Sequence, residues 1–302
     1  MDKKTLATAV ALVGVAGMLA LAGCSGASGG SEPSASAAKS KDYGKFNDQL
    51  PEKIRSKGTL DLFIQQPNPP MEFTEEGSDE LKGIDPELAA EFADLFGVKI
   101  VWHRVTEFSE LIPSIQTGRG DLVISAALDK KSRQDVVSFV DYFSTGSQWV
   151  VAKDSKIKKV SDLCGNTVST GTGTSYIDQI AEFSKSECES KGKKPISTLT
   201  TVSVAEQMMM ITQGRAVANL EGVESGGYLI TSQPGKWKTL GEPFNRASYG
   251  IIFAKGDDKL GTAVKAALDY MIKDGSYGKI LKKWNVSSAA VEEGVINGAT
   301  TD

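Results

Sequence analysis

Short runs of β-branched and aromatic residues alternate with longer runs of helical spacing from residue 58 onward. Strands that alternate with helices are typical of βαβ units, in which helices cover the faces of a mainly parallel sheet. The alternation therefore predicts an α/β fold, and 302 residues are enough for two domains. The expected strands are 59–65, 98–105, 122–126, 167–170 and 217–220.

Capping residues predict where the helices begin and end. Asp85 is expected as the N-cap of a helix that ends at Gly97. Ser203 and Glu206 have the spacing of a capping box at the start of another helix. The tail, residues 286–302, has weak patterning and is expected to fray.

The N-terminus has the parts of an export signal. Residues 1–4 carry positive charge, residues 6–21 are apolar or small, and the stretch ends in Leu-Ala-Gly-Cys at Cys24. This tetrapeptide resembles a bacterial lipobox, so we expect a signal peptide over residues 1–23 and a lipid on Cys24. A transmembrane anchor is the alternative, although a stretch of about 16 residues is short for a membrane span.

Residues 24–44 are expected to form a flexible tether, because they have almost no bulky apolar side chains. Two acyl chains on Cys24 would anchor the protein stably to a membrane. Together these features predict a protein held by lipid at the extracellular face of the cell membrane of a Gram-positive bacterium.

Cys164 and Cys188 remain once Cys24 is assigned to the lipid. An even pair of cysteines in an oxidising exterior is a disulfide candidate. Two buried free thiols are the alternative.

The sequence lacks the features that mark several functional classes. A net charge of -4 without a basic stripe argues against nucleic-acid binding. One histidine, His103, is present, so a metal site or a serine-histidine dyad would need unusual partners. Gly171-Thr172-Gly173 lacks the third glycine of a dinucleotide fingerprint, and no P-loop occurs. We therefore expect no cofactor, no metal and no catalytic residues.

The turn over residues 171–175 offers a different chemistry. A Gly-Thr-Gly-Thr-Ser segment joins an expected strand to an expected helix there. Backbone N–H groups at a helix start, together with the helix dipole, favour a bound carboxylate, and Thr174 and Ser175 add hydroxyl donors. Ordinary helix capping by these two side chains is the alternative.

A series of motifs runs through the chain in a fixed order. The first half contains Pro69-Pro70-Met71-Glu72-Phe73, Gly83-Ile84-Asp85, Phe108-Ser109-Glu110-Leu111, Gly118-Arg119-Gly120-Asp121 and Ser132-Arg133. The second half contains Asp162-Leu163-Cys164-Gly165, Gly214-Arg215-Ala216, Tyr249-Gly250-Ile251 and Asp274-Gly275-Ser276-Tyr277-Gly278. Over about residues 55–285 this order resembles the bacterial extracellular solute-binding proteins of family 3, the amino-acid receptors of ABC importers.

The resemblance implies a two-lobed α/β fold that is periplasmic-binding-protein-like (type II), with two crossover hinge strands. Lobe 1 would comprise residues 45–147 and 247–302, and lobe 2 residues 148–246. The ligand would lie in the cleft between the lobes, which close around it by a hinge motion.

The resemblance also implies site residues. Arg133 matches the arginine that holds the ligand α-carboxylate, a role that suits its planar, permanently charged guanidinium. Phe108 matches an aromatic platform for the ligand, and the backbone of Ala126 and Leu128 matches the strand end that receives the amino group. Gly173, with Thr174 and Ser175, matches the turn on the other lobe. A surface role for the arginine and a core role for the phenylalanine are the alternatives.

The sequence departs from the family pattern at three positions. The family's second aromatic residue falls at Asn68, which we keep as a site residue, and its usual threonine before the arginine is Lys130. The acid that pairs with the ligand ammonium aligns to Gly222. Glu221, one residue away, could replace it, and so could Glu224.

The implied function is that of the substrate-binding component of an ABC importer. Such a component captures an amino acid or a similar small zwitterion and delivers it to a membrane permease. A ligand-sensing lipoprotein without a transport role is the alternative from another class, and a dehydratase of a small carboxylic acid on the same fold is a third. We expect a monomer.

Overall fold

The computed structural model describes residues 42–300. The predicted signal peptide, Cys24 and most of the predicted tether lie outside the described residues. At the end of that tether, the Gly44 N–H donates to the Asp94 carbonyl oxygen at 2.8 Å. Within residues 42–300 we find no helix with the length and the apolar content that crossing a bilayer requires.

A nine-stranded sheet runs through the described part of the chain in the order β4-β1-β5-β10-β6-β9-β7-β8, with β11 also paired to β6. Its strands are β1 (Thr59–Gln65), β4 (Lys99–Val105), β5 (Leu122–Val123), β6 (Val137–Ala152), β7 (Thr167–Gly171), β8 (Ser197–Thr201), β9 (Ala218–Gly222), β10 (Trp237–Ala254) and β11 (Val295–Ile296). A second sheet pairs β2 (Phe73–Thr74) with β3 (Leu81–Lys82).

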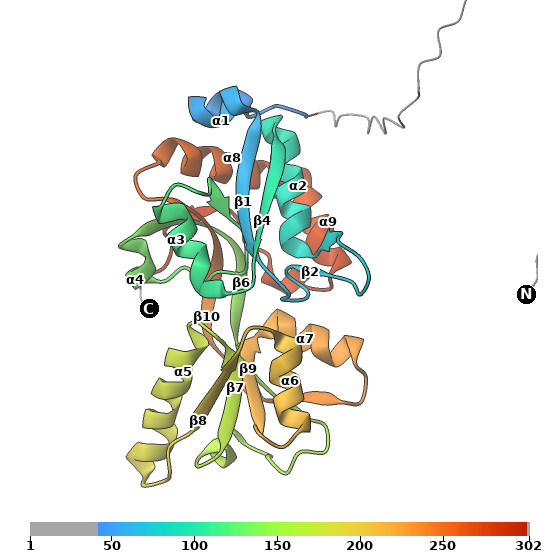
Figure 1. The fold of residues 1–302 in the computed structure, drawn as a ribbon, viewed down its shortest axis with the longest axis vertical. Coiled ribbons are helices and arrows are strands. Elements are labelled where there is room, and N and C mark those ends of the chain that lie inside the picture. The colour runs from blue at the N-terminus through green and yellow to red at the C-terminus, as the bar shows by residue number, and fades with distance from the viewer. Residues whose placement is uncertain (1–41, 301–302) are drawn as a thin grey trace, which may run out of the picture. The chain divides into compact units, whose positions relative to one another are not determined.

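Two groups of helices pack on this sheet. One group surrounds β1, β4 and β5, and the other surrounds β7, β8 and β9 (Figure 1). The first group is α1 (Glu52–Lys57), α2 (Ile84–Phe96), α3 (Leu111–Gln116), α4 (Lys131–Gln134), α8 (Asp258–Asp274) and α9 (Ser276–Lys283). The second is α5 (Tyr176–Phe183), α6 (Val204–Thr212) and α7 (Val223–Ser232).

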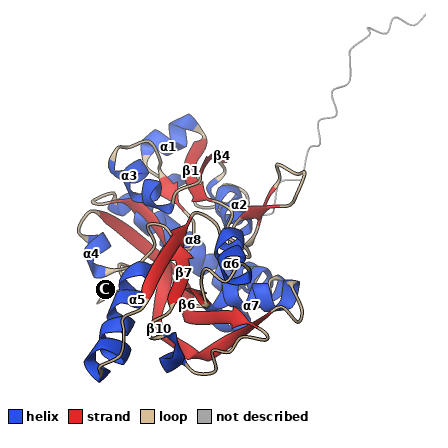
Figure 2. Ribbon diagram, turned by 60° about the horizontal axis from the view of Figure 1, so that its bottom comes forward, coloured by secondary structure: helices blue, strands red, loops and turns tan. Residues whose placement is uncertain are grey.

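Two long strands join the two groups. β6 has 16 residues and β10 has 18, and they pair antiparallel along their whole lengths. β10 pairs with β5 in the first group, and β6 pairs with β9 in the second. Figure 2 shows both strands running through the molecule, with helices on either side of them. The predicted α/β fold of two lobes with two crossover strands is confirmed.

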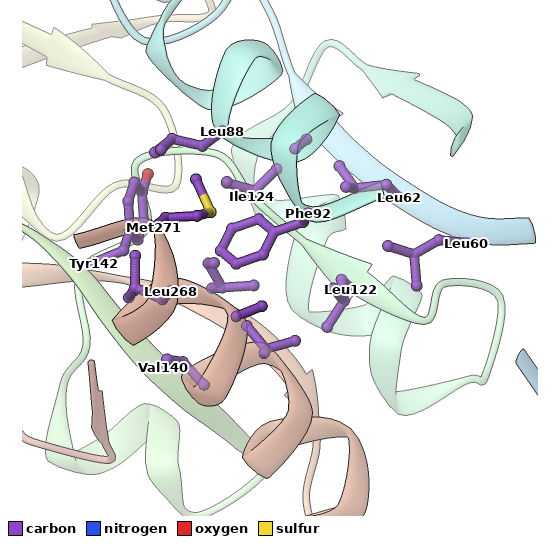
Figure 3. Close-up of a cluster of buried hydrophobic side chains, with 14 of the residues drawn as sticks. Leu60, Leu62, Leu88, Phe92, Leu122, Ile124, Val140, Tyr142, Leu268 and Met271 are labelled. Carbon is purple, nitrogen blue, oxygen red and sulfur yellow. The ribbon is translucent and has the colours of Figure 1, made fainter. Parts of the chain in front are cut away.

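The larger hydrophobic core lies in lobe 1. Phe92 of α2 packs with Leu268 and Met271 of α8 over Leu62 of β1 and Ile124, which follows β5, and all five residues are buried (Figure 3). Burial of each such side chain stabilises the lobe by about 1.5–3 kcal/mol. This core makes a firm base for the loops that follow β1 and β5, and these loops carry part of the site.

Two local predictions about lobe 1 are wrong. Helix α2 begins at Ile84 with Gly83 as its N-cap, so Asp85 is not the cap. The Asp85 carboxylate instead accepts hydrogen bonds from the Ala126 N–H at 2.9 Å and from the Tyr142 hydroxyl at 2.6 Å. These tertiary partners compete successfully with the local capping bond, because the Asp85 side chain is fully buried.

The C-terminal tail is docked where fraying was expected. Residues 295–296 form β11 against β6, and the Asn297 N–H donates to the Phe139 carbonyl oxygen at 3.1 Å. The tail lacks hydrophobic periodicity because, beyond Val291, which packs against the core of lobe 1, hydrogen bonds hold it.

Lobe 2 contains a disulfide between Cys164 and Cys188, whose Cα atoms lie 5.5 Å apart. The bond joins positions 24 residues apart, and β7 and α5 lie between them. Closing a loop of this length stabilises a fold by about 3 kcal/mol. The bond therefore fixes the end of α5 that lies away from the cleft.

Candidate ligand-binding site

A cavity of about 70 Å³ lies between the two lobes, at the crossover strands. Its wall combines loops after β1 and β5 with the turn after β7 and the end of β9. Eight of the predicted site residues line it: Asn68, Phe108, Ala126, Leu128 and Arg133 from lobe 1, and Thr174, Ser175 and Glu221 from lobe 2. The structure therefore brings residues that are far apart in the sequence to a single crevice.

Arg133 supplies positive charge to the wall of the cavity from α4. Its Nη1 donates to the Leu128 carbonyl oxygen at 2.9 Å, and its guanidinium lies 5.4 Å from the centre of the Phe108 ring. Both contacts restrain the side chain. Burial lowers the pKa of Arg133, but a guanidinium is so strong a base that it keeps its charge. The group suits a carboxylate ligand.

The backbone at Ala126 has an unusual conformation, with φ of 44°. Its N–H is held by the buried carboxylate of Asp85, which also accepts the Tyr142 hydroxyl. Burial raises the pKa of Asp85 to about 6. Left-handed backbone in a non-glycine residue is uncommon and persists only where its surroundings enforce it. The Asp85 contact is such a constraint at the wall of the cavity.

The glycine-rich turn reaches the cavity from lobe 2. The Thr174 hydroxyl donates to the Gly171 carbonyl oxygen at 2.8 Å, and Ser175 precedes the first residue of α5. The positive end of the α5 dipole therefore lies at the cavity. Gly173 does not line the cavity: a Cβ added there would lie 3.2 Å from the Ser109 Cβ of lobe 1. Its role is to allow close approach of the two lobes.

Glu221, near the end of β9, lines the cavity and carries a buried carboxyl group. Its side chain is 3% exposed, and neither carboxylate oxygen has a hydrogen-bond partner among the described residues. Burial, reinforced by the charge of Glu224, raises the pKa of Glu221 to about 8. A buried carboxyl group without partners is costly unless a ligand supplies them.

Glu224 lies in a different environment. Its carboxylate accepts the Thr145 hydroxyl from β6 and the Tyr249 hydroxyl from β10, each at 2.7 Å. It does not line the cavity, whereas Glu221 does. Of the two acids that the sequence left as alternatives, Glu221 is the one that lines the cavity.

Gly222 leaves room for that Glu224 carboxylate. A Cβ added at residue 222 would lie 1.8 Å from the Glu224 Oε1 and 2.6 Å from the Tyr249 hydroxyl oxygen. Any side chain at this position would force the carboxylate off its two partners. The departure from the family pattern at residue 222 thus has a steric reason.

Gly222→Ala is expected to destabilise the protein by about 1–3 kcal/mol, because the added methyl group overpacks a hydrogen-bonded site. The matched control is Gly227→Ala in α7, where an added Cβ meets open space. That change should be neutral or stabilise the helix by up to about 1 kcal/mol. Urea unfolding measures both changes, and an equal response of the two variants would contradict this explanation.

Further residues at the cavity were missed in the sequence. Tyr176, Tyr249, Gln65, Gln207 and Ser225 all line it. The Tyr176 and Tyr249 hydroxyl oxygens lie 3.2 Å apart and link α5 to β10. Tyr176 had the spacing of an apolar helix face, and Tyr249 belonged to a family motif to which no site role was assigned. No local pattern marked the other three, because their approach depends on how the lobes meet.

Within residues 42–300, no group of three or more histidine, cysteine, aspartate or glutamate side chains is arranged to hold a metal ion. His103 lies outside the cavity, with its Nε2 2.7 Å from the Asp61 Oδ1.

Comparison with known proteins points to one family. The model of the bacterial extracellular solute-binding proteins, family 3, matches residues 60–287. The arginine-binding protein ArgT of Corynebacterium glutamicum is 26% identical over 249 residues, which cover 82% of this chain and 81% of that protein.

Two solved structures are similar across most of the described chain. A mutant of ArgBP from T. maritima is 27% identical, with a TM-score of 0.69 over 77% of this chain and 97% of that one. The ancestral amino-acid-binding protein AncCDT-1, a precursor of cyclohexadienyl dehydratase, is also 27% identical. Its TM-score is 0.69, and the match covers 77% of this chain and 97% of that one. These neighbours confirm the type II periplasmic-binding-protein fold. The named relatives are solute-binding proteins, not enzymes.

Proposed function

The chain belongs to the bacterial extracellular solute-binding proteins of family 3, and on that premise we propose that it binds an amino acid in the cavity between its lobes. The observation that carries the proposal is that a guanidinium and a carboxyl group line one cavity from opposite lobes: Arg133 from lobe 1 and Glu221 from lobe 2. An α-amino acid presents the complementary pair, a carboxylate and an ammonium group.

Each end of the ligand has a suitable receptor. Arg133 and the start of α5 would share the carboxylate, because a guanidinium and the positive end of a helix dipole both favour an anion. Glu221 would accept hydrogen bonds from the ammonium group, which would supply the partners that its oxygens lack. Phe108 would form the platform beneath the ligand and hold Arg133 in place.

Binding would be coupled to closure, because the two receptors lie on different lobes. Ligand contacts made by both lobes favour the closed state over the open one, and β6 and β10 would carry the hinge motion. We further propose that a lipid on Cys24 holds the protein at the outer face of the membrane and that the closed form delivers its ligand to an ABC permease. The family and the N-terminal sequence support this part of the proposal.

A thermal-shift panel of the twenty L-amino acids tests the binding function. At a hundred times its dissociation constant, a ligand stabilises the folded state by about 2.7 kcal/mol. For a chain of this size that corresponds to a rise in melting temperature of roughly 5–10 °C. At least one amino acid should produce it, and its α-amide and N-acetyl derivatives should produce a smaller rise at the same concentration. A panel with no response would overturn the proposal.

Transport is tested separately from binding. Deletion of the gene should abolish uptake of the radiolabelled amino acid at low concentration, and the intact gene should restore it. Unchanged uptake in the deletion strain, together with tight binding, would favour the alternative of a sensing protein without a transport role.

A further inference from the structure

The C-terminal tail lies beyond the part of the chain that the family model matches, which ends at residue 287. It is nevertheless held firmly on lobe 1. β11 pairs antiparallel with β6, and Asn297 exchanges two hydrogen bonds with the backbone of Phe139, of 3.1 and 2.8 Å. Val295 and Ile296 are 42% and 39% exposed, so burial of apolar surface contributes little. Hydrogen bonds direct this docking.

The end of the tail meets the segment that carries Arg133. The Ala299 N–H donates to the Asp129 Oδ2 at 3.0 Å, and the Gln134 Nε2 donates to the Ala299 carbonyl oxygen at 3.0 Å. Gln134 Nε2 also lies 2.9 Å from the Asp129 Oδ1. Three residues from two distant parts of the chain thus form a closed hydrogen-bonded ring next to Arg133.

This ring matters because α4 has only four residues. A helix that short has no stability of its own and depends on contacts at its ends. At one end the Arg133 Nη1 donates to the Leu128 carbonyl oxygen, and the Asp129 N–H donates to the Ser248 carbonyl oxygen of β10 at 3.0 Å. At the other end, Gln134 is held by Asp129 and by the tail.

Asp141 of β6 lies directly under the tail. Its side chain is 5% exposed, and a Cβ added at Gly298 would lie 2.4 Å from its Oδ2. Glycine is therefore needed for the tail to cross this carboxyl group. Burial, followed by the neighbouring charge of Asp129, raises the pKa of Asp141 to about 8. The raised pKa favours the neutral form of Asp141 beside Asp129.

We propose that residues 294–299 form a strap that positions Arg133 for the ligand carboxylate. The strap acts through Asp129 and Gln134 and does not itself line the cavity around Arg133. This inference rests on the proposed function, in which Arg133 holds the carboxylate. It adds a positioning element that the family match does not include.

Gly298→Leu tests the strap, because the new side chain cannot fit over Asp141. The matched control is Gly278→Leu, on the exposed face of α9, where an added Cβ meets open space. A second variant ends the chain after Gly294 and keeps the bond from the Gly294 N–H to Asp269. Both test variants should remain folded, since neither touches the hydrophobic cores.

The first measurement needs no ligand. The amides of Arg133 and Gln134 in the short helix, and of Val136 just after it, are hydrogen-bonded and should be protected from exchange with solvent. In both strap variants their exchange should accelerate about tenfold or more, while α2 and the Gly278→Leu control stay unchanged. Unchanged exchange at these three amides would overturn the inference, whatever ligand the protein binds.

The second measurement uses two probes, L-arginine and L-argininamide, which differ in the carboxylate. The strap variants should bind L-arginine about three- to thirtyfold more weakly and L-argininamide with unaltered affinity. In an Arg133→Ala background, Gly298→Leu should have no further effect on L-arginine binding. Equal losses for both probes would show a general structural role and overturn the inference. Failure of the unaltered protein to bind any amino acid would refute the proposed function. The exchange measurement would still test the strap in that case, because it needs no ligand.

Discussion

Arg133→Ala is expected to weaken binding of the amino-acid ligand by about a hundredfold or more while leaving the fold intact. Truncating one member of a buried, hydrogen-bonded charge pair costs about 2–5 kcal/mol of binding free energy, partly because the ligand carboxylate is left desolvated. The fold should tolerate the change, because the guanidinium lies at a cavity wall and not in a hydrophobic core. Titration calorimetry measures the affinity, and thermal unfolding without ligand measures the fold.

Arg104→Ala is the matched control for this change. Arg104 is exposed on β4 and donates to the Asp79 carbonyl oxygen, away from the cavity. Its removal should leave the affinity unaltered. Arg133→Lys should lie between the parent and Arg133→Ala, because an ammonium group keeps the charge but loses the planar fork. Unaltered affinity in Arg133→Ala would remove this residue from the site.

Glu221→Gln is expected to change affinity and stability in opposite directions. The pKa of Glu221 is raised from its ordinary 4.5 to about 8 in the folded protein, so the folded state holds a proton that the unfolded chain releases. The free energy of unfolding therefore falls as the pH rises from 4.5 to about 8, and this contribution is level outside that window. Glutamine at residue 221 does not ionise, so the variant avoids this fall in the free energy of unfolding. It should stabilise the ligand-free protein by roughly 1–3 kcal/mol at pH 7–8.

The effect on binding has the opposite sign. An ammonium ligand needs the ionised carboxylate, so binding at pH 7 should release close to one proton, and affinity should rise as the pH increases from 6 to 8. In Glu221→Gln the affinity should fall about a hundredfold and lose this pH dependence. Calorimetry in buffers with different ionisation enthalpies measures the released proton.

Glu182→Gln, on the exposed face of α5, is the matched control and should change neither the ligand affinity nor the free energy of unfolding. If Glu221→Gln lowered stability and left affinity unaltered, Glu221 would be a structural residue. The ammonium contact would then have to come from Glu224, after it left Thr145 and Tyr249.

Much of the site was predictable from sequence because its parts follow local rules. The turn before α5 has the glycine and hydroxyl residues of an anion-binding helix start, and the order of motifs pointed to Arg133 and Phe108. Ser203 was predicted as an N-cap, and its Oγ accepts the Glu206 N–H at 3.3 Å. These features depend on residues close together in the chain or on motifs that a family preserves.

Other parts could not be predicted from sequence. Glu221 and Glu224 are three residues apart and equally plausible as ammonium receptors, yet Thr145 and Tyr249, from both crossover strands, occupy only Glu224. Asp85 was assigned to a helix cap, but its partners lie 41 and 57 residues away. In both cases the choice depends on which hydrogen-bond donors the assembled lobes bring to a buried carboxylate.

The sequence by itself determined the alternation of strands and helices, the two-lobed plan and the candidate for the carboxylate receptor, because periodicity, capping and motif order act over short stretches of chain. The tertiary structure alone decided which acid faces the cavity, why residue 222 is glycine, and that the unpatterned tail docks beside Arg133. Burial and the pairing of polar groups depend on neighbours that are distant in the sequence, and those neighbours exist only once the lobes have assembled.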